Sequence, residues 1–346
     1  MSLSQGMADV MKLRSLEIYE VHGCRPVVPA APLASPAEPE MRRDHLHAAA
    51  RLCAAIAEQS DAEAMLDCAL EGMAARFGFA NAVVLVPDDE GGKLSTIASR
   101  GYPAFGIGSE IPLGMGTIGV VAALRRSLRI CDMRRGERYA LAVQAEAMRN
   151  GLEEIPLPSL PQARSQLAVP LSSRGRLVGV LFVESERAFA FSHADEEALS
   201  LVASQLATSL LLTERDRPEG RASPSAGHRP AATTERRIAI RYFPFDGSIF
   251  VDGGYVIRGL PGRLLLHFLS CYLRTGRTDF TNREVRRDPS LRLPEFKDNL
   301  ETRLILLRRR LEERGGPIRL SRPDRGQIRL ECDGMPEIEM ATADRG

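Results

Sequence analysis

The sequence has no apolar run of about 18 residues and no charged-then-apolar signal pattern at its start, so we expect neither a membrane span nor secretion. Its six cysteines are widely separated and form no CxxC pair, which excludes the usual zinc-ligand spacing. A chain of 346 residues also has no need of disulfides for stability. No nucleophile with an acid–base partner stands out. We therefore expect a cytoplasmic protein that is not an enzyme, and the sequence indicates no metal and no particular cofactor.

Charge is nearly balanced over the whole chain but is unevenly distributed. The chain carries 46 Lys and Arg against 45 Asp and Glu. Residues 236–331 hold 21 basic and 12 acidic residues, a net charge of +9, which leaves −8 for the remainder. A basic C-terminal module on an acidic body is the charge pattern expected of a tethered nucleic-acid-binding domain.

The basic segment contains a predicted helix followed directly by a predicted hairpin. Apolar residues recur every three or four positions, which indicates one buried helix face: Phe296, Leu300, Leu304, Leu307 and Leu311. A Gly-Gly-Pro run at residues 315–317 ends the helix. Residues 318–322 and 327–331 have the pattern of two short strands joined by a turn. A basic helix followed by a basic hairpin is the layout of a winged-helix DNA-binding domain.

The same segment resembles the winged-helix output domain of OmpR/PhoB-type response regulators. The run LRRRLE at residues 307–312 is similar to the end of that family's recognition helix, and residues 318–330 are similar to its wing. Residues 259–269 look like its first helix, and residues 280–285 look like the start of its second. The resemblance covers residues 238–332 and implies a module that binds double-stranded DNA.

Arginine dominates the basic side chains of this module, and its planar fork suits bidentate contacts to bases and phosphates. The predicted DNA-binding residues are Lys297, Thr302, Arg303, Arg308, Arg309, Arg310, Arg319, Arg322 and Arg325, with Arg329 as a further candidate. A charge run on a helix can also be only a solvated face. Where the family often has basic residues in mid-helix, this chain has Ile305 and Leu306. That apolar pair either contacts thymine methyl groups or docks a protein.

Residues 41–214 alternate helix and strand patterns in the order α-β-β-α-β-α-β-β-α. Helices are predicted at residues 41–58, 62–77, 120–126, 139–149 and 192–214, and strands at residues 82–86, 93–102, 128–132, 166–171 and 177–183. A Ser-Asp break at residues 60–61 caps the second helix, and Ser192 with Asp195 forms a capping-box pattern at the start of the last.

Three runs in this segment carry a resemblance to GAF domains, the small-molecule and signalling modules of many sensors: IPLGMGTIGVVAALRRSLRICD, SQLAVPLSSRGRLVGVLFVES and FSHADEEAL. The resemblance implies an antiparallel sheet flanked by helices, with a ligand pocket between the sheet and the long excursion after residue 132. A Ser-Glu pair at residues 185–186 stands where cyclic-nucleotide members have Asn-Lys, and the cysteine set of GAF-type methionine sulfoxide reductases is missing.

The predicted lining of that pocket is Leu85, Ile97, Cys131, Tyr139, Met148, Gln166, Ala168 and Leu181. These residues are alternatively the plain core of a ligand-free dimerisation domain, because a fold alone does not establish function. Cys131 is either a redox or metal sensor or an inert small hydrophobic residue. His45 and His47, two apart on a helix, do not share a face and are poor metal ligands.

The last helix of the same segment carries a stripe that predicts a homodimer seam, made of Leu199, Val202, Leu206 and Leu210. The alternative is that these four side chains only cover the domain's own sheet.

The predicted organisation is a disordered segment (residues 1–40), a GAF sensor and dimerisation domain (41–214), a flexible linker (215–237), a winged-helix domain (238–332) and a polar tail (333–346). The fold class is α+β. The predicted function is a homodimeric transcriptional regulator that senses a small molecule or a partner's state and binds promoter DNA. The alternative is a signalling or interaction protein whose winged helix docks another protein.

Overall fold

The computed structural model describes residues 37–88, 91–133, 155–215, 236–291, 300–324 and 326–341. Residues 42–346 form one compact unit, and of residues 1–41, which form the other, only the start of helix α2 is described. The predicted disordered segment (residues 1–40) lies outside the described residues except at residues 37–40, which are helical and so correct that prediction. The predicted linker (residues 215–237) also lies outside them except at residue 215, which ends a helix, and residues 236–237, where a strand begins at Arg237. The predicted helix at residues 139–149 lies outside the described residues. Below, the N-terminal domain means residues 42–215 and the C-terminal module means residues 236–341.

The N-terminal domain is built on one antiparallel sheet of six strands in the order β3-β2-β1-β6-β5-β4. Its strands are β1 (Asn81–Pro87), β2 (Lys93–Arg100), β3 (Glu110–Pro112), β4 (Leu128–Ile130), β5 (Ser165–Ser173) and β6 (Arg176–Ser185). The two central strands, β1 and β6, are nearly continuous apolar runs, which is the pattern of strands buried on both faces.

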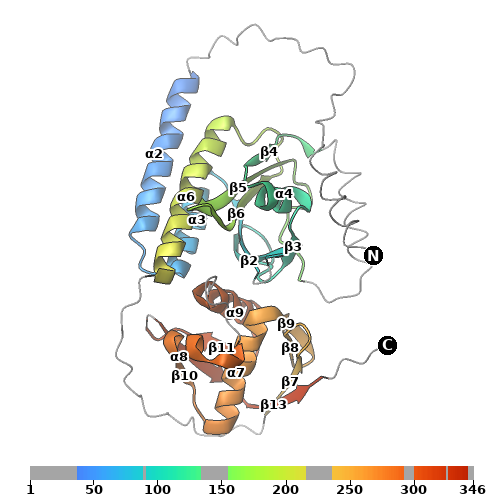
Figure 1. The fold of residues 1–346 in the computed structure, drawn as a ribbon. Coiled ribbons are helices and arrows are strands. Elements are labelled where there is room, and N and C mark those ends of the chain that lie inside the picture. Colours follow the sequence, from blue (N-terminus) through green and yellow to red (C-terminus); the bar gives the residue numbers. More distant parts are fainter. Residues whose placement is uncertain are drawn as a thin grey trace, which may run out of the picture. The chain divides into compact units, whose positions relative to one another are not determined.

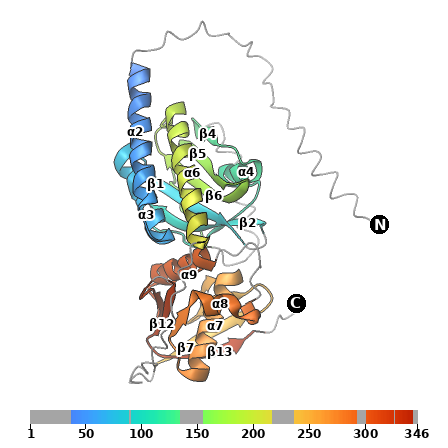
Figure 2. The same cartoon turned by 60° about the vertical axis from the view of Figure 1, so that its left-hand side comes forward.

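Helices cover both faces of this sheet, as Figures 1 and 2 show. On one face lie α3 (Ala62–Phe77) and α6 (His193–Arg215), with α2 (Ala37–Ala57) beside them, and on the other lies α4 (Gly116–Leu124). Asp61 accepts hydrogen bonds from the Glu63 and Ala64 amides at 3.0 Å and so begins α3, as predicted.

Two apolar clusters result from the alternation of side chains along the strands. Val83 and Leu85 of β1 belong to the cluster on the α4 face, whereas Val84 and Val86 belong to the cluster beneath α3 and α6. The second cluster continues without a break into the C-terminal module, where it includes Leu306. One apolar core is therefore shared by the two parts of residues 42–346.

The C-terminal module begins with three strands and then alternates helices with a second small sheet. Its elements are β7 (Arg237–Phe243), β8 (Ser248–Val251), β9 (Gly254–Ile257), α7 (Gly259–Thr275), β10 (Asp279–Thr281), α8 (Asn282–Arg287), the 3-10 turn η4 (Pro289–Leu291), α9 (Leu300–Arg314), β11 (Ile318–Ser321), β12 (Gln327–Cys332) and β13 (Met335–Met340). The sheets have the orders β13-β7-β8-β9 and β10-β12-β11. Strands β11 and β12 form the expected hairpin after α9.

Strand β13 lies where the sequence predicted only a polar tail. It pairs in parallel with β7, and its two glutamates meet arginines of that strand. Glu337 bonds Arg237 at 2.6 Å and Glu339 bonds Arg241 at 3.3 Å. Ile338 packs against the core between these two pairs. The segment is therefore an alternating, ion-paired edge strand. Its partner strand lies about 100 residues earlier in the sequence, so no local pattern indicates the pairing.

Within the described ranges, no helix is long and apolar enough to cross a membrane.

Candidate functional site

Helix α9 has buried side chains on more than one face. Leu300, Leu304, Leu307 and Leu311, the stripe predicted from the sequence, are all buried. Thr302, Arg303, Ile305 and Leu306 are buried as well. The helix packs on α7, β9 and β11 of its own module and also on α3 and β2 of the N-terminal domain. A second set of contacts therefore covers the face on which a DNA-reading helix would present its side chains.

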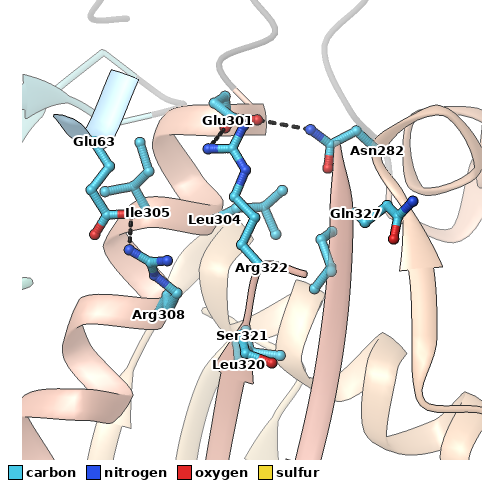
Figure 3. A pocket seen from close by; sticks show the side chains of 11 residues that line it. Glu63, Asn282, Glu301, Leu304, Ile305, Arg308, Leu320, Ser321, Arg322 and Gln327 are labelled. Carbon is cyan, nitrogen blue, oxygen red and sulfur yellow. Dashed lines mark hydrogen bonds and ion pairs between the residues drawn. The ribbon is translucent and has the colours of Figure 1, made fainter. Parts of the chain in front are cut away.

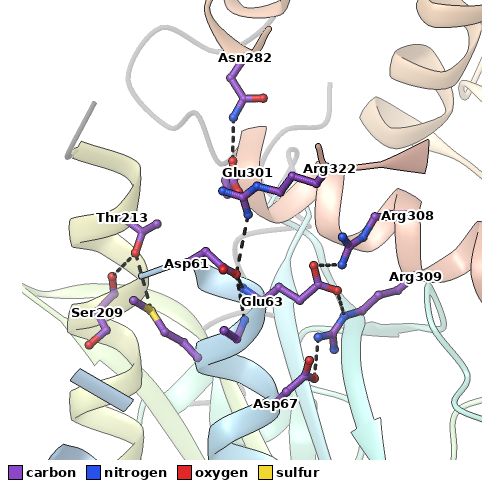
Figure 4. Close-up of polar contacts among 12 residues, drawn as sticks. Asp61, Glu63, Asp67, Ser209, Thr213, Asn282, Glu301, Arg308, Arg309 and Arg322 are labelled. Atoms are coloured by element: carbon purple, nitrogen blue, oxygen red, sulfur yellow. Dashed lines mark hydrogen bonds and ion pairs between the residues drawn. The ribbon is translucent and has the colours of Figure 1, made fainter. Parts of the chain in front are cut away.

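Two arginines of α9, Arg308 and Arg309, point at acidic side chains on the first two turns of α3, as Figure 4 shows. The Arg309 guanidinium bridges two of them, with Nε 3.0 Å from Glu63 Oε1 and Nη2 2.6 Å from Asp67 Oδ1. Arg308 also pairs with Glu63. Burial lowers the pKa of Arg308 from its ordinary value, the direction expected for a cation withdrawn from water. Glu63 and Asp67 share one helix face because they are four residues apart.

Two further arginines extend the contact on either side of this pair. Arg322, just after β11, lies 3.0 Å from Glu301 and 3.7 Å from Asp61, the residue that caps α3. The Arg303 Nη2 donates to the Pro87 carbonyl at the end of β1, at 2.6 Å.

The last two turns of α9 make contacts of a different kind. Arg310 donates to the Val256 carbonyl at 2.9 Å and pairs with Glu313 at 2.9 Å. Glu313 in turn accepts hydrogen bonds from the backbone amides of Gly106 and Ile107, at 2.8 and 3.2 Å. This end of α9 thereby joins the C-terminal module to the loop before β3.

A second link between the two parts is centred on Glu110 of β3. Arg258, which caps α7, donates to Glu110 from Nε at 2.8 Å, and Lys93 donates from Nζ at 3.0 Å. Burial alone would raise the pKa of Glu110, but the bonds from Arg258 and Lys93 outweigh it and hold that pKa below its ordinary value.

The arginines of the β11–β12 hairpin pair within their own module instead. Arg319 makes two bonds of 2.7 Å to Asp333. Arg329 lies 2.7 Å from Asp279. Both side chains are about half exposed.

The structure thus gathers four of the predicted DNA-binding residues at one junction with the N-terminal domain: Arg303, Arg308, Arg309 and Arg322. Arg310 bonds within its own module, Thr302 is buried, and Arg319 is about half exposed on the hairpin. Lys297 and Arg325 lie outside the described residues.

A small pocket opens between α3, α9 and the hairpin, lined by Glu63, Arg308, Arg322, Glu301, Asn282 and their neighbours (Figure 3). Its volume of about 30 Å³ is close to that of one water molecule. Asn282 donates across it to Glu301 at 2.8 Å. The pocket is too small for an effector, so its polar walls serve contacts within the chain.

The α4 face of the N-terminal sheet holds a buried polar cluster that the sequence analysis missed. Glu184 of β6 is buried and accepts a hydrogen bond from the Leu160 amide at 2.5 Å. Burial raises the pKa of Glu184, and the bond from Leu160 offsets this only in part. Beside it, burial and the neighbouring Glu184 raise the pKa of the Tyr102 hydroxyl, and Thr117 donates to Gln166 at 2.7 Å. The alternation of side chains along β6 could have indicated this position, since Glu184 lies on the same face of the strand as Val180 and Phe182.

The predicted pocket residues do not meet in one place. Leu85 and Ala168 belong to the cluster on the α4 face, whereas Ile97 and Leu181 belong to the cluster on the opposite face. These pairs cannot line a single cavity. Gln166 joins the polar cluster on the α4 face through Thr117.

Cys131 directly follows β4, half-buried, with Sγ 3.7 Å from Arg129 Nη1. Tyr139 and Met148 lie outside the described residues. Across the described part of the chain, no group of three or more His, Cys, Asp or Glu side chains is placed to hold a metal ion.

The predicted dimer seam is also placed differently. Leu199, Val202, Leu206 and Leu210 are buried in the core of the domain itself, so they cover its own sheet and cannot form a seam between two copies. The exposed face of α6 adjoins α2 and forms a groove of about 390 Å³, lined by Leu46, Ala50, Cys53, Leu201, Ser204, Gln205 and Thr208.

The family described as GAF domain matches residues 61–210, and the mixed α+β architecture with its curled antiparallel sheet fits that fold. These residues are therefore a GAF domain, which suggests a sensor or signalling role for the chain. The match spans α3 to α6 and leaves the C-terminal module unassigned.

Three solved structures illustrate the likeness. A free methionine-R-sulfoxide reductase from Neisseria meningitidis is 20% identical, with 51% of this chain and 93% of that one covered, at a TM-score of 0.41. The GAF domain of an Acinetobacter phosphoenolpyruvate-protein phosphotransferase is 21% identical, with 52% and 98% covered, at 0.41. A putative GAF sensor protein from Burkholderia vietnamiensis is 19% identical, with 50% and 98% covered, at 0.39. No curated protein matches the chain.

Proposed function

We propose that the protein is a transcriptional regulator in which the GAF domain senses a small molecule or a partner's state and the C-terminal module binds promoter DNA. The observation that carries the proposal is the element order of the module. Three strands, β7, β8 and β9, precede three helices, α7, α8 and α9, and a hairpin follows the third helix directly. That order agrees with a winged helix in which α9 reads the major groove and β11–β12 is the wing.

The charge of the module supports the same reading. The net charge of +9 over residues 236–331 is concentrated in arginines, and α9 alone carries five of them over its 15 residues. Neutralising phosphates with such side chains releases counterions, which makes binding steeply dependent on salt.

The sensor function would use the polar cluster on the α4 face. A buried carboxyl with a raised pKa, a phenol and an amide offer both donors and acceptors in an apolar surrounding. We propose Glu184, Tyr102 and Gln166 as the groups that a small polar effector would contact. Titration calorimetry of Glu184→Ala against wild type with a panel of small metabolites tests this assignment.

A homodimer would use the exposed face of α2 and α6 rather than the buried stripe. Leu46, Leu201 and Leu212 are exposed there, and half-sites on DNA are commonly bound by dimers. Light scattering after gel filtration of wild type and Leu201→Glu tests the proposal, since a charge in the seam should shift a dimer to monomers. A monomeric wild type would contradict it.

The test of DNA binding is fluorescence anisotropy of the full chain with labelled random-sequence duplex across a salt series. We expect a Kd of about 1–100 µM at physiological salt, with tighter binding at low salt and steeply weaker binding as salt is added. Arg319→Ala should weaken binding, because Arg319 is a half-exposed arginine of the hairpin. The matched control Arg51→Ala removes an exposed arginine from α2 and should change little. Equal effects of the two variants would contradict binding through the C-terminal module.

The alternative function, a winged helix that docks another protein through Ile305 and Leu306, has a specific observation against its simplest form. Ile305 and Leu306 are only 4% and 2% exposed, because α9 packs against the GAF domain of the same chain. An external partner at this face would first have to displace that domain.

A further inference from the structure

We propose that Asp61, Glu63 and Asp67 of the GAF domain occupy the places of DNA phosphates on α9 and its hairpin, so that the GAF domain and DNA compete for the same arginines. This inference rests on the proposed DNA-binding function and adds to it the device by which the GAF domain would control the output.

The chemistry of the contact is the chemistry of phosphate recognition. Carboxylate oxygens accept the same charge-assisted hydrogen bonds from guanidinium groups as phosphate oxygens do. Arg309 spans two carboxylates, with bonds of 3.0 Å to Glu63 and 2.6 Å to Asp67. Glu63 also pairs with Arg308, so Glu63 and Arg309 each have two partners in this group.

The acids are spaced so that one helix end presents all three. Glu63 and Asp67 are one turn apart on α3, and Asp61 is the residue that caps this helix. Arg322, which directly follows β11 of the hairpin, reaches Asp61 at 3.7 Å. The three carboxylates therefore engage both parts of the proposed DNA-binding surface, the helix and the wing.

The apolar pair on α9 explains how the contact is held. Ile305 and Leu306 stand where related recognition helices often carry basic residues, and both are buried in the core that the two parts share. Arg303 adds a bond of 2.6 Å to the carbonyl of Pro87. Residues that would make a poor DNA contact thus make a good contact with the GAF domain.

The ion pairs between α9 and α3 are partly exposed to solvent, so this contact can open and close reversibly. The Asp67 side chain is exposed, and that of Arg308 keeps 22% of its surface exposed. Pairs of this kind are screened by salt and contribute modestly. A change in the GAF domain that shifts α3 would release Arg308, Arg309 and Arg322 together, because α3 and its capping residue hold all three.

The experiment compares DNA binding by three full-length proteins at about 50 mM salt, measured by fluorescence anisotropy. They are wild type, the double variant Glu63→Gln/Asp67→Asn and the charge-matched control Glu58→Gln/Glu71→Gln. Glu58, in the turn after α2, and Glu71 of α3 are exposed acids, and Glu71 lies near Arg100 rather than α9. Both variants raise the net charge by two, so any difference between them is not a general charge effect.

We expect Glu63→Gln/Asp67→Asn to bind DNA about tenfold more tightly than wild type, and the control to bind within about twofold of it. Equal affinities for all three proteins would overturn the competition while leaving DNA binding intact. Absence of DNA binding by every protein would instead overturn the proposed function, and this inference with it.

Hydrogen exchange gives a readout that does not depend on DNA. Amides of residues 300–314 should exchange faster in Glu63→Gln/Asp67→Asn than in wild type and the control, while the buried strands β1 and β6 keep their protection. Unchanged exchange in α9 would mean that these carboxylates do not hold the helix, which would also overturn the inference. Retained protection of the strands shows that the variant is folded.

Discussion

Two groups of arginines on the same C-terminal module differ in what they pair with. Arg308 and Arg309 of α9 keep 22% and 12% of their side chains exposed and pair with α3, more than 200 residues away in the sequence. Arg319 and Arg329 of the hairpin keep 46% and 47% exposed and pair with acids of their own module. A basic segment of the sequence therefore predicts where positive charge lies. The tertiary contacts decide whether that charge is available to bind another molecule.

The largest expected effect that separates the two regions comes from the apolar anchor of α9. Leu306→Ala should lower the free energy of unfolding by about 2–5 kcal/mol, because a buried leucine is replaced by a cavity in the shared core. The control Leu273→Ala, at an exposed leucine of α7, should cost less than about 0.5 kcal/mol. Urea unfolding followed by circular dichroism measures both. Equal small losses would mean that α9 is not anchored to the GAF domain.

A smaller effect should distinguish the two sets of ion pairs directly. Arg309→Ala leaves Glu63 and Asp67 without their bridging partner and should cost about 1–3 kcal/mol of stability. Arg329→Ala removes a half-exposed pair with Asp279 and should cost about 0–1 kcal/mol. The same unfolding assay in added salt should reduce the loss in Arg329→Ala more than that in Arg309→Ala. A larger loss of stability in Arg329→Ala than in Arg309→Ala would contradict this difference between the two sets of ion pairs.

The comparison also predicts a difference in acid. The pKa of Glu110, bonded by Arg258 across the two parts, and the pKa of Asp333, bonded by Arg319 within the module, are both lowered. A lowered carboxyl pKa contributes stability that is present above the unfolded value, 4.5 for Glu110, and is lost as pH falls through the folded value.

Melting temperatures across pH 3–6 measure this contribution, a range that brackets the ordinary carboxyl pKa values of about 4. Glu110→Gln should flatten the acid side of the profile clearly, whereas Asp333→Asn should hardly change it, because Asp333 is about half exposed and water screens its pair with Arg319. Identical profiles for the two variants would show that the Glu110–Arg258 link adds nothing to stability.

The smallest expected effect comes from the α4 face of the N-terminal sheet, where a carboxyl pKa is raised rather than lowered. Burial raises the pKa of Glu184, so its contribution is present at low pH and is lost as pH rises through the folded value. Glu184→Gln should therefore be no less stable than wild type at about pH 4 and relatively more stable at about pH 8. Loss of stability at both pH values would show instead that Glu184 works as a charged group.

Much of the fold followed from local patterns. The caps at Asp61 and Ser192 were predicted, and the structure has both, with the Ser192 amide bonded to Asp195 at 2.7 Å. The strands of the hairpins and the leucine stripe of α9 were predicted for the same reason, since each depends on residues that are near in sequence.

What the sequence did not determine was which face of an element meets which neighbour. Leu85 and Leu181 are adjacent apolar positions on paired strands, but Leu85 lies opposite Val180, so Leu181 faces the other way. Helix α6 likewise carries two stripes, and the wider one, through Leu199 and Leu206, is used for the domain's own sheet. The acidic partners of α9 are more than 200 residues away, and no local period indicates them.

The double burial of α9 has a consequence for how sequences of this kind can diverge. A surface helix tolerates change on the side that faces solvent, but α9 has little such side, since residues 300 and 302–307 are all buried. A substitution in α9 that improves its packing against one part of the protein therefore also changes its packing against the other. In a saturation mutagenesis screen, we expect these positions to accept fewer amino acids than those of α7, whose outer side, including Leu273, is free to vary.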